Sequence, residues 1–405
     1  MKTLAGTRAL APRARFGYLH VHRFLFRLGL SIANIFAWIF VFQYFYIQSG
    51  RLQGSLISTI LMYCLAQATT IILTPLSAAH LRHGVKHSIV YGALAAGAAY
   101  IYLGATLSSF NGGLAEWGIA IFALLLGAYR ALYWVPYQLE ASGASKERSR
   151  MPIAYEAVIA LMPIFAGVTL ATVPFAPQRI LFGAVIFILL SLLPLLPLRN
   201  MFEGFSWSYG ETFRQYFSPR HRQLLITSLM QGLQGATLFL LWPIAVFFIV
   251  GSQFHVLGAV ISATLFAVLL LRALYSRFIK RTGLERSTIV LSVFSASGWL
   301  MRLFAGTPFV IFFVDAYSHV SSPRISNSID IFAYEQTADQ GSFIDEYTTL
   351  KEIGLAFGRI LACLVCALLL IWTSFAIAFA SIIILTAVVS AVFVIIERTA
   401  APTVY

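Results

Sequence analysis

The chain has 405 residues, of which 59% are hydrophobic and only 11% are charged, and its mean hydropathy is +0.83. A soluble domain carries about 25% charged residues. This composition therefore excludes a soluble domain and makes lipid the main solvent of the protein. The formal net charge is +13. Most basic residues lie at the ends of apolar segments, where they set membrane orientation, so the charge does not indicate nucleic-acid binding.

Twelve apolar segments follow one another, each about long enough to cross a bilayer core, which takes about 20 residues as a helix. We predict the first six helices at 23–47, 54–79, 88–110, 115–139, 152–174 and 179–198. We predict the other six at 222–250, 254–277, 286–304, 308–334, 352–373 and 376–396. The expected fold is an all-α polytopic membrane protein with 12 transmembrane helices in two pseudo-symmetric six-helix bundles, residues 23–198 and 222–396.

Three polar segments flank these bundles. Residues 1–22 contain four basic residues and no acid, which favours a cytoplasmic tail beside anionic lipid; an organellar transit peptide is the alternative. The run at 199–221 is the longest polar, basic stretch between apolar segments, and we predict that it is a cytoplasmic linker. Residues 397–405 form a cytoplasmic C-terminal tail.

The basic residues outside the helices lie almost entirely on one side of the predicted membrane. Of the 28 Lys and Arg residues, 20 fall on that side and only Arg51 and Arg179 on the other. Because Lys and Arg are enriched on the cytoplasmic side, we predict a multi-pass protein of the plasma membrane with both termini in the cytoplasm.

A short pattern recurs in the loops after the second and eighth helices. The first loop reads HLRHGVKHS and contains Arg82 and Gly84; the second reads FIKRTGLERS and contains Arg281 and Gly283. Glycine permits the positive φ of a tight turn between antiparallel helices. The recurrence at matching positions indicates that the two halves are weakly similar.

With this plan and these loops, the chain resembles the major facilitator superfamily of secondary transporters over about residues 23–396. The loop signature of that family, G-x-L-a-D-r-x-G-r-k, maps onto residues 77–86, with Leu81 at the acidic position. In the second copy Lys280 takes that position. The resemblance implies a cytoplasmic gate role for the matching residues Arg82, Gly84, Lys86, Arg281 and Gly283.

Two helix patterns of the same family are half present. In the fourth helix Leu126 and Arg130 match, whereas Tyr133 stands where the family has Gln. In the fifth helix the antiporter pattern G-P-x-x-G-G keeps Pro163 and Gly167. The resemblance therefore implies efflux by exchange against protons, with proton-coupled uptake as the alternative.

The tenth segment holds the densest set of ionisable and polar residues. Asp315, His319, Ser322, Ser326 and Asp330 are spaced to share one helical face. A charged group costs roughly 2.5–3.5 kcal/mol at the centre of a membrane helix, so it normally faces a cavity or a partner. Asp315 is our leading proton carrier or solute ligand; a permanent ion pair with an Arg, which only orients helices, is the alternative. We expect Asp330 to be a structural ion-pair member.

The first, fourth, seventh and tenth helices line the central cavity in the resembled family, and here each carries a polar or aromatic stripe. The expected substrate-binding residues are Asn34, Trp38, Arg130, Tyr133, Tyr137, Gln231, Gln234, Trp242, Asp315 and His319. Such a set suits a small, partly apolar solute. Interfacial anchoring of the aromatic residues, and an ion pair of Arg130 with Glu156 or Asp315, are open alternatives.

Three further charged residues lie in or near the predicted helices. Glu156 fits proton coupling, and it also fits an ion pair with a basic residue of the preceding loop. Arg302 lies near a helix end, where its side chain can snorkel to the interface, and Arg359 lies deepest.

Motifs for metals, cofactors and soluble enzymes are missing from the sequence. The three cysteines lie in apolar runs and are interpreted as small buried hydrophobic residues. His80, His83 and His87 have no acid nearby, so we expect no metal site. No phosphate-binding glycine loop, GxSxG or HExxH occurs, so we expect neither a cofactor nor an enzyme.

The sequence as a whole predicts a secondary active transporter whose halves rock about a site near the midplane. The expected partners are membrane lipid, a small-molecule substrate and protons as the coupling ion, and we expect a monomer because no helix has a clear small-residue dimer face. A non-transporting membrane sensor and a membrane enzyme acting on a lipid-linked substrate are the alternatives.

Overall fold

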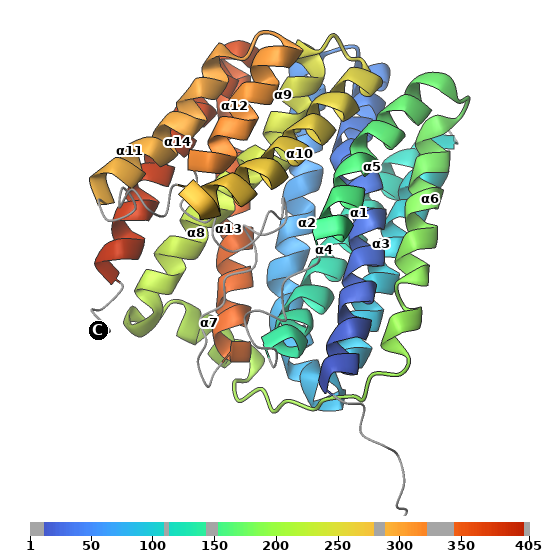
Figure 1. The fold of residues 1–405 in the computed structure, drawn as a ribbon, viewed down its shortest axis with the longest axis vertical. Helices are drawn as coiled ribbons and strands as arrows, with labels where there is room; N and C mark the ends of the chain where they lie inside the picture. Colours follow the sequence, from blue (N-terminus) through green and yellow to red (C-terminus); the bar gives the residue numbers. More distant parts are fainter. Residues whose placement is uncertain (1–11, 109–112, 143–152, 279–287, 322–343, 401–405) are drawn as a thin grey trace, which may run out of the picture.

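The computed structural model describes residues 12–108, 113–142, 153–278, 288–321 and 344–400. Within these ranges every regular element is a helix (Figure 1), as predicted. Ten of the described helices are long and apolar enough to cross a membrane. The segment Thr288–Phe304 is a shorter apolar helix.

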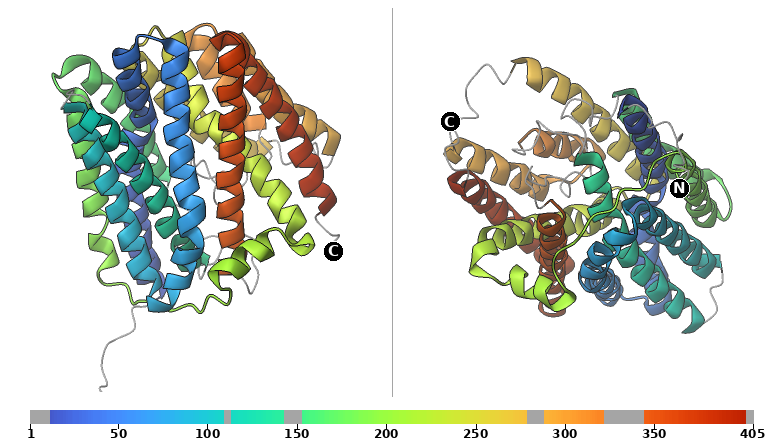
Figure 2. Two further views of the ribbon diagram at one scale, coloured as in Figure 1. Left: turned by 180° about the vertical axis from the view of Figure 1, so that it is seen from behind. Right: turned by 90° about the horizontal axis from the view of Figure 1, so that it is seen from below.

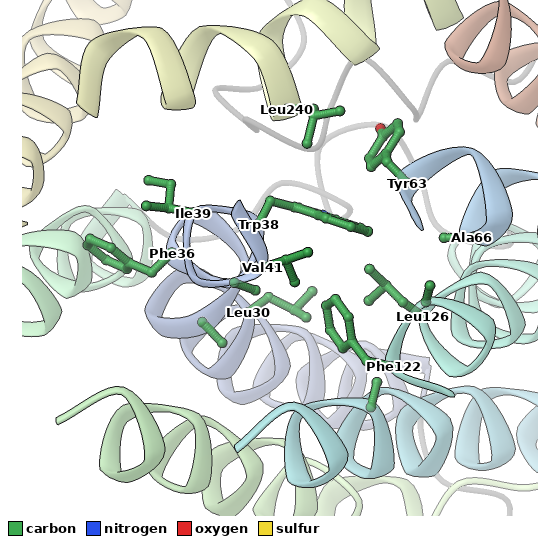
Figure 3. Close-up of a cluster of buried hydrophobic side chains, with 14 of the residues drawn as sticks. Leu30, Phe36, Trp38, Ile39, Val41, Tyr63, Ala66, Phe122, Leu126 and Leu240 are labelled. Atoms are coloured by element: carbon green, nitrogen blue, oxygen red, sulfur yellow. The ribbon is translucent and has the colours of Figure 1, made fainter. Parts of the chain in front are cut away.

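The first group of helices contains α1 to α6, of which α2 and α5 also pack extensively on the second group. Their bounds are α1 Pro12–Ser49, α2 Leu52–His80, α3 Val85–Ser108, α4 Gly113–Ser142, α5 Ile153–Thr172 and α6 Ala176–Leu190, with the short 3-10 turns η1 Leu81–His83 after α2 and η2 Leu193–Leu195 after α6. The aromatic rings of Trp38, Tyr63 and Phe122 meet in the core of this group (Figure 3).

The second group contains the helices from α8 onward. Their bounds are α8 Arg222–Ala236, η4 Thr237–Leu241, α9 Trp242–Ile249, α10 Phe254–Phe278, α11 Thr288–Leu300, η7 Met301–Phe304, α12 Pro308–Ser321, α13 Ile344–Trp372 and α14 Phe375–Ala400. Here η4 is a π-helical turn that joins α8 to α9 without a break, and η7 is a 3-10 turn that ends α11.

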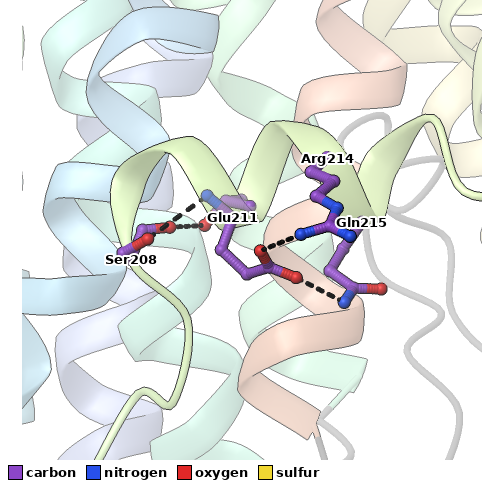
Figure 4. A network of polar contacts seen from close by, with 5 residues as sticks. Ser208, Glu211, Arg214 and Gln215 are labelled. Atoms are coloured by element: carbon purple, nitrogen blue, oxygen red, sulfur yellow. Dashed lines mark hydrogen bonds and ion pairs between the residues drawn. The ribbon is translucent and has the colours of Figure 1, made fainter.

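A short amphipathic helix, α7 (Tyr209–Tyr216), lies between the two groups and is followed by the turn η3 (Pro219–His221). Ser208 caps α7 by accepting a hydrogen bond from the Glu211 amide at 3.3 Å (Figure 4). Tyr216 is buried in a cluster with Ile71 of α2 and Ile353 of α13. The linker is therefore fixed against both groups, and we refer to its side of the molecule as the α7 end.

Helices α2 and α13 form the first seam between the groups, and they lie side by side in Figure 2. Gln53 Nε2 donates to the Thr373 carbonyl at 2.9 Å, and farther toward the α7 end Arg359 Nη1 donates to Gln67 Oε1 at 3.2 Å. Residue numbers rise on one helix as they fall on the other, so the pair is antiparallel.

Helices α5 and α10 form the second seam. Gly167 and Gly258 let the two backbones approach closely, because a Cβ on Gly258 would collide with the Pro163 carbonyl. The Ile164 amide of α5 donates to Ser262 Oγ of α10 at 2.9 Å. Two antiparallel helix pairs thus join the groups, and the space between the seams holds the cavity described below.

Several predicted helix bounds differ from the structure. α1 begins at Pro12 rather than at 23, because the basic residues at its start do not oppose helix formation. The sixth predicted helix, 179–198, was too long at its C-terminal end: α6 ends at Leu190, since Pro194 can supply no amide to continue it. In the tenth predicted segment the described helix ends at Ser321, so Ser322, Ser326 and Asp330 lie outside the described residues.

Candidate functional site

A cavity of about 110 Å³ lies between the two groups. Residues of α1 and α5 line it from the first group, and residues of η4, α9, α10 and α12 line it from the second. Its polar side chains are Arg27, Ser31, Asn34, Glu156, Trp242, Thr264, Asp315 and His319. The rest of the wall is largely apolar, with Ile35, Leu238 and Val260 among its members. The cavity therefore combines ionisable groups with an apolar surface, as small-molecule sites do.

Asp315 of α12 is held at the cavity wall by an ion pair. Arg302 donates to its Oδ1 from Nη2 at 3.0 Å and from Nε at 3.2 Å. The indole of Trp242 donates to Oδ2 at 3.0 Å. The Arg302 side chain is 2% exposed and that of Asp315 is 16% exposed, so the carboxylate is the partner that retains access to the cavity.

Two aromatic rings surround the guanidinium of Arg302. Its Cζ lies 4.2 Å from the ring centre of Trp299 and 5.2 Å from that of Trp242. A cation over an indole face is stabilised electrostatically, and more strongly when water is excluded. The cluster of Trp242, Trp299, Arg302 and Asp315 thus compensates a buried charge with one carboxylate and two π faces.

The prediction that Arg302 snorkels to the interface is wrong. Arg302 lies in η7, the tightened last turn of the α11 segment, and this turn directs the side chain inward to Asp315. The alternative of an ion pair between Arg130 and Asp315 is not the arrangement observed. The spacing of Trp299 and Arg302, which places them on one helical face, was the signal in the sequence that indicates this partnership.

The first-group wall owes its shape to Pro163. A proline has no amide hydrogen, so the Ile159 carbonyl one turn earlier loses its usual donor. Ser31 Oγ of α1 donates to that carbonyl at 3.2 Å. This contact holds α1 against α5 and places Arg27, Ser31 and Asn34, which are spaced along one helical face, toward the cavity.

The second-group wall contains the π-turn η4. A π-turn inserts an extra residue into a helix and is found frequently at functional sites. Here it turns the Trp242 side chain relative to α8, and Leu238, Phe239 and Trp242 all line the cavity. Thr237, the first residue of the turn, hydrogen-bonds to Thr386 of α14 at 2.9 Å between their hydroxyl oxygens, which anchors the turn to the outer helix.

The predicted site residues divide into two sets. Asn34, Glu156, Trp242, Asp315 and His319 line the cavity together. The others do not line it: Trp38, Arg130, Tyr133, Tyr137, Gln231 and Gln234 are buried elsewhere among the helices.

The aromatic residues of the second set belong to the core of the first group. Trp38 packs on Tyr63 with ring centres 5.1 Å apart. Tyr133 hydrogen-bonds through its hydroxyl to His22 Nε2 at 3.0 Å, and Tyr137 stacks on its ring. These contacts account for the burial of the aromatic stripe in α4.

The loop assigned to a gate packs within the first group. Gly84 has φ +125° and lies directly against the Asn200 side chain, so a Cβ at this position has no space. The Lys86 amide donates to Asn200 Oδ1 at 3.1 Å, and Lys86 Nζ donates to the Leu196 carbonyl at 2.8 Å. Gly84 and Lys86 therefore hold the start of the linker. Arg82 is exposed, and Arg281 and Gly283 lie outside the described residues.

The described residues contain no group of three or more His, Cys, Asp or Glu side chains suited to a metal ion. His80 and His83 stack with ring centres 4.9 Å apart. The cysteines Cys64, Cys363 and Cys366 are free thiols. Cys64 of α2 and Cys363 of α13 lie at matching levels of the first seam, between the contact of Gln53 with Thr373 and that of Gln67 with Arg359.

No family model matches the sequence, and no curated protein is similar enough in sequence to count as a relative. Solved structures are similar in fold. A bacterial homologue of the iron transporter ferroportin, in an outward-facing state, matches with a TM-score of 0.60 and 15% identity, over 95% of this chain and 98% of that one. A point mutant of the peptide transporter POT matches with a TM-score of 0.60 and 12% identity, over 95% and 94% of the two chains.

The human organic anion transporter MFSD10 (TETRAN) has a TM-score of 0.57 and 12% identity, over 95% of this chain and all of that one. At identities this low the likeness establishes the fold alone. The chain has the fold of the major facilitator superfamily, and its long apolar helices make it a multi-pass membrane protein.

Proposed function

We propose that the protein is a secondary active transporter of a small, partly apolar solute. It would cross the membrane with twelve helices in two six-helix bundles, residues 23–198 and 222–396. The observation that carries the proposal is the cavity between the two groups, which has Asp315 and Glu156 in its wall. Buried ionisable groups at membrane depth are costly and mark solute or proton pathways.

The cavity wall supports a solute with both apolar and polar parts. Its apolar side chains come from both groups, and the indole of Trp242 adds an aromatic edge. Asn34 and Ser31 offer neutral hydrogen-bonding groups on the opposite wall. Since each group contributes part of the wall, movement of one group against the other would change the site and its access together.

Asp315 is the proposed proton carrier. Its carboxylate faces the cavity, where a proton can reach it, while Arg302 behind it is closed off. Protonation would remove the charge that pairs with Arg302 and weaken the contact with Trp242, which itself lines the cavity. Proton binding would thereby alter the solute site, as coupling requires. Glu156 on the other wall is the second candidate.

Efflux into the external medium is the proposed direction. It is supported by Pro163 and Gly167, which match the antiporter pattern of the resembled family and lie in the seam between α5 and α10. The basic bias of the loops supports a cytoplasmic α7 end and cytoplasmic termini in the plasma membrane.

Proteoliposomes with an internal pH-sensitive dye test the proposal. A library of small, partly apolar solutes is added under an imposed proton gradient, and we expect some members to dissipate the gradient through the wild-type protein. Asp315→Asn should abolish this solute-dependent dissipation of the gradient, whereas Glu211→Gln on α7 should not. Normal dissipation by Asp315→Asn would remove Asp315 from coupling. Chemical turnover of a lipid without any gradient would support the enzyme alternative instead.

A further inference from the structure

The side of the cavity that faces away from α7 ends in phenylalanine rings. On α1 and α9 the last residues that line the cavity are Ile35 and Val246, and on α10 the first is Val260. Beyond these residues, toward the end opposite α7 (Figure 1), aromatic rings from both groups meet. They belong to Phe36, Phe40 and Phe42 of α1, Phe247 and Phe248 of α9, Phe254 of α10 and Phe375 of α14. We call these rings the phenylalanine seal.

The rings of the seal touch across the boundary between the groups. The ring centre of Phe254, in the second group, lies 6.0 Å from that of Phe36 and 5.8 Å from that of Phe40, both in the first group. Beside this contact, Phe42 and Phe248 meet edge to face with ring centres 5.3 Å apart. Centres about 4.5–7 Å apart are typical of aromatic pairs in contact, so these pairs join α1 to the second group.

The seal offers water no group to bind. Its rings carry no polar atom, and Phe36, Phe40 and Phe247 are at most 1% exposed. The cavity wall next to it differs, since it includes Ser31 and Asn34 of the same helix α1. Apolar constrictions exclude water and hydrated ions. A dry layer of rings therefore separates the cavity from the end opposite α7.

Phe254 is the central ring of the seal. Besides Phe36 and Phe40 it contacts Phe247 of its own group, with ring centres 4.9 Å apart. It is the first residue of α10, so it directly follows the turn that joins α9 to α10. Phe254 is only partly buried, whereas Phe36 and Phe40 are fully buried. Of these rings, it is the one that has room to move.

The turn before Phe254 has a strained backbone. Gly251 and Ser252 have φ values of +68° and +60°, and the left-handed region suits glycine but not serine. The Ser252 amide donates to the Phe247 carbonyl at 2.8 Å, and the Gly251 amide donates to the Phe248 carbonyl at 3.0 Å. Residues 251–253 are exposed, so packing does little to fix the turn. Backbone strain of this kind is concentrated at clamps and switch regions.

We propose that the phenylalanine seal is a gate between the cavity and the end opposite α7, and that Phe254 is its moving part. The structure shows the closed form. When the turn at 250–253 relaxes, the end of α9 draws Phe247 away from the Phe254 ring, which then turns out from between α1 and α9. The backbone of Phe254 stays in place, because its carbonyl lies against Gly167 of α5. The inference rests on the proposed transport function and adds the element that controls access on one side.

Labelling of a cysteine in the cavity tests the gate. The three native cysteines are replaced by alanine, and Asn34→Cys places one thiol in the cavity wall. A membrane-impermeant, anionic methanethiosulfonate is added to right-side-out or inside-out vesicles from expressing cells, and mass spectrometry follows the labelling. Separate reporter variants at exposed positions, Gln48→Cys at the end opposite α7 and Gln223→Cys at the α7 end, show which end each vesicle preparation exposes.

The ring itself is tested by truncation. From the end opposite α7, Asn34→Cys alone should react slowly, and added Phe254→Ala should raise the rate at least about tenfold by favouring the open form. The matched control is Phe309→Ala at the start of α12, which removes a ring that is 70% exposed and outside the seal. It should change the rate by less than about twofold.

The turn is tested by two substitutions of the exposed Ser252, which also keep the test open if Phe254→Ala fails to fold. Asparagine tolerates the left-handed conformation, whereas the β-branched valine does not. With the seal intact, Ser252→Val should therefore let Asn34→Cys react at least about threefold faster than Ser252→Asn from the end opposite α7. From the α7 end the two variants should react equally fast.

The inference is overturned if Asn34→Cys, with the seal intact, reacts from the end opposite α7 as fast as the reporter Gln48→Cys. It is also overturned if Phe254→Ala has no larger effect than Phe309→Ala, or if it accelerates labelling equally from both ends, as a loosened bundle would. These readouts need no solute, so the two proposals fail separately. A gate that passes them in a protein without flux contradicts transport alone, and coupled flux in a protein whose cavity thiol reacts freely contradicts the gate alone.

Discussion

The ion pair of Asp315 and Arg302 is buried, and the same chain contains an exposed pair for comparison. Asp315→Asn keeps the shape of the side chain but leaves the Arg302 charge without its carboxylate. Breaking one side of a buried pair costs about 3–5 kcal/mol in the free energy of unfolding. The two indole faces at 4.2 and 5.2 Å remain and retain part of the stabilisation. We therefore expect a loss of about 3 kcal/mol, the lower end of that range.

The coupling between the two residues follows from the same contacts. Arg302→Gln alone should lower the free energy of unfolding by less than Asp315→Asn does. The Asp315 side chain that it leaves unpaired is 16% exposed, so water in the cavity can reach its carboxylate. The double variant should be about 1–2 kcal/mol more stable than the sum of the single losses predicts, as for residues in direct contact.

Titration with SDS in mixed micelles, followed by the helical circular dichroism signal, measures these free energies. The control is Glu211→Gln with Arg214→Gln on α7, a pair 3.7 Å apart whose Arg214 side chain is 84% exposed. This pair should contribute less than about 1 kcal/mol. A coupling energy for Asp315 and Arg302 no larger than that of the α7 pair would refute the assignment of a buried charge cluster.

Three further predictions concern the seams and the linker. Gly258→Ala places a methyl group against a backbone carbonyl of α5 and should lower the thermal stability in detergent. The control Gly183→Ala, with nothing within 4 Å of its Cβ, should be neutral or slightly stabilising. Equal effects of the two variants would contradict the close contact of α5 and α10. Ser208→Ala should destabilise α7 locally by about 1 kcal/mol, seen as faster hydrogen exchange of α7 amides with unchanged exchange in α2. Diamide should cross-link Cys64 to Cys363, detected by mass spectrometry of the digested chain; cross-linking of Cys366 in place of Cys363 would show that the register of α2 and α13 is wrong.

The sequence predicted the helices well because their signal is local. Long apolar runs are set by the thickness of the bilayer and can be counted without knowledge of tertiary structure. The errors fall where a short-range effect overrides hydropathy. Pro194 ends α6 early, and the π-turn η4 inside the predicted seventh helix leaves no trace in its apolar pattern.

The candidate site was less predictable, since it depends on which helix faces meet. Periodicity indicates that Asp315 and His319 share a face of their helix, and both line the cavity. It cannot tell whether a polar stripe faces the cavity, a seam or the core of one group. Gln231 and Gln234 lie on the turns of α8 whose glycines pack against α13, and Trp38 packs on Tyr63, for reasons set by partners more than 20 residues away in sequence.

Alternating access of the two groups is the central claim, and distances between them test it most directly. Spin labels are placed on exposed positions in a variant whose three cysteines are replaced by alanine. One pair, Gln48 and Gln253, spans the groups at the end opposite α7, and the other, His83 and Gln223, spans them at the α7 end. Pulsed electron resonance then measures both distances in nanodiscs, with and without a transported solute and at two pH values. The account predicts that one distance shortens as the other lengthens; distances that change together, or that stay fixed under every condition, would contradict it.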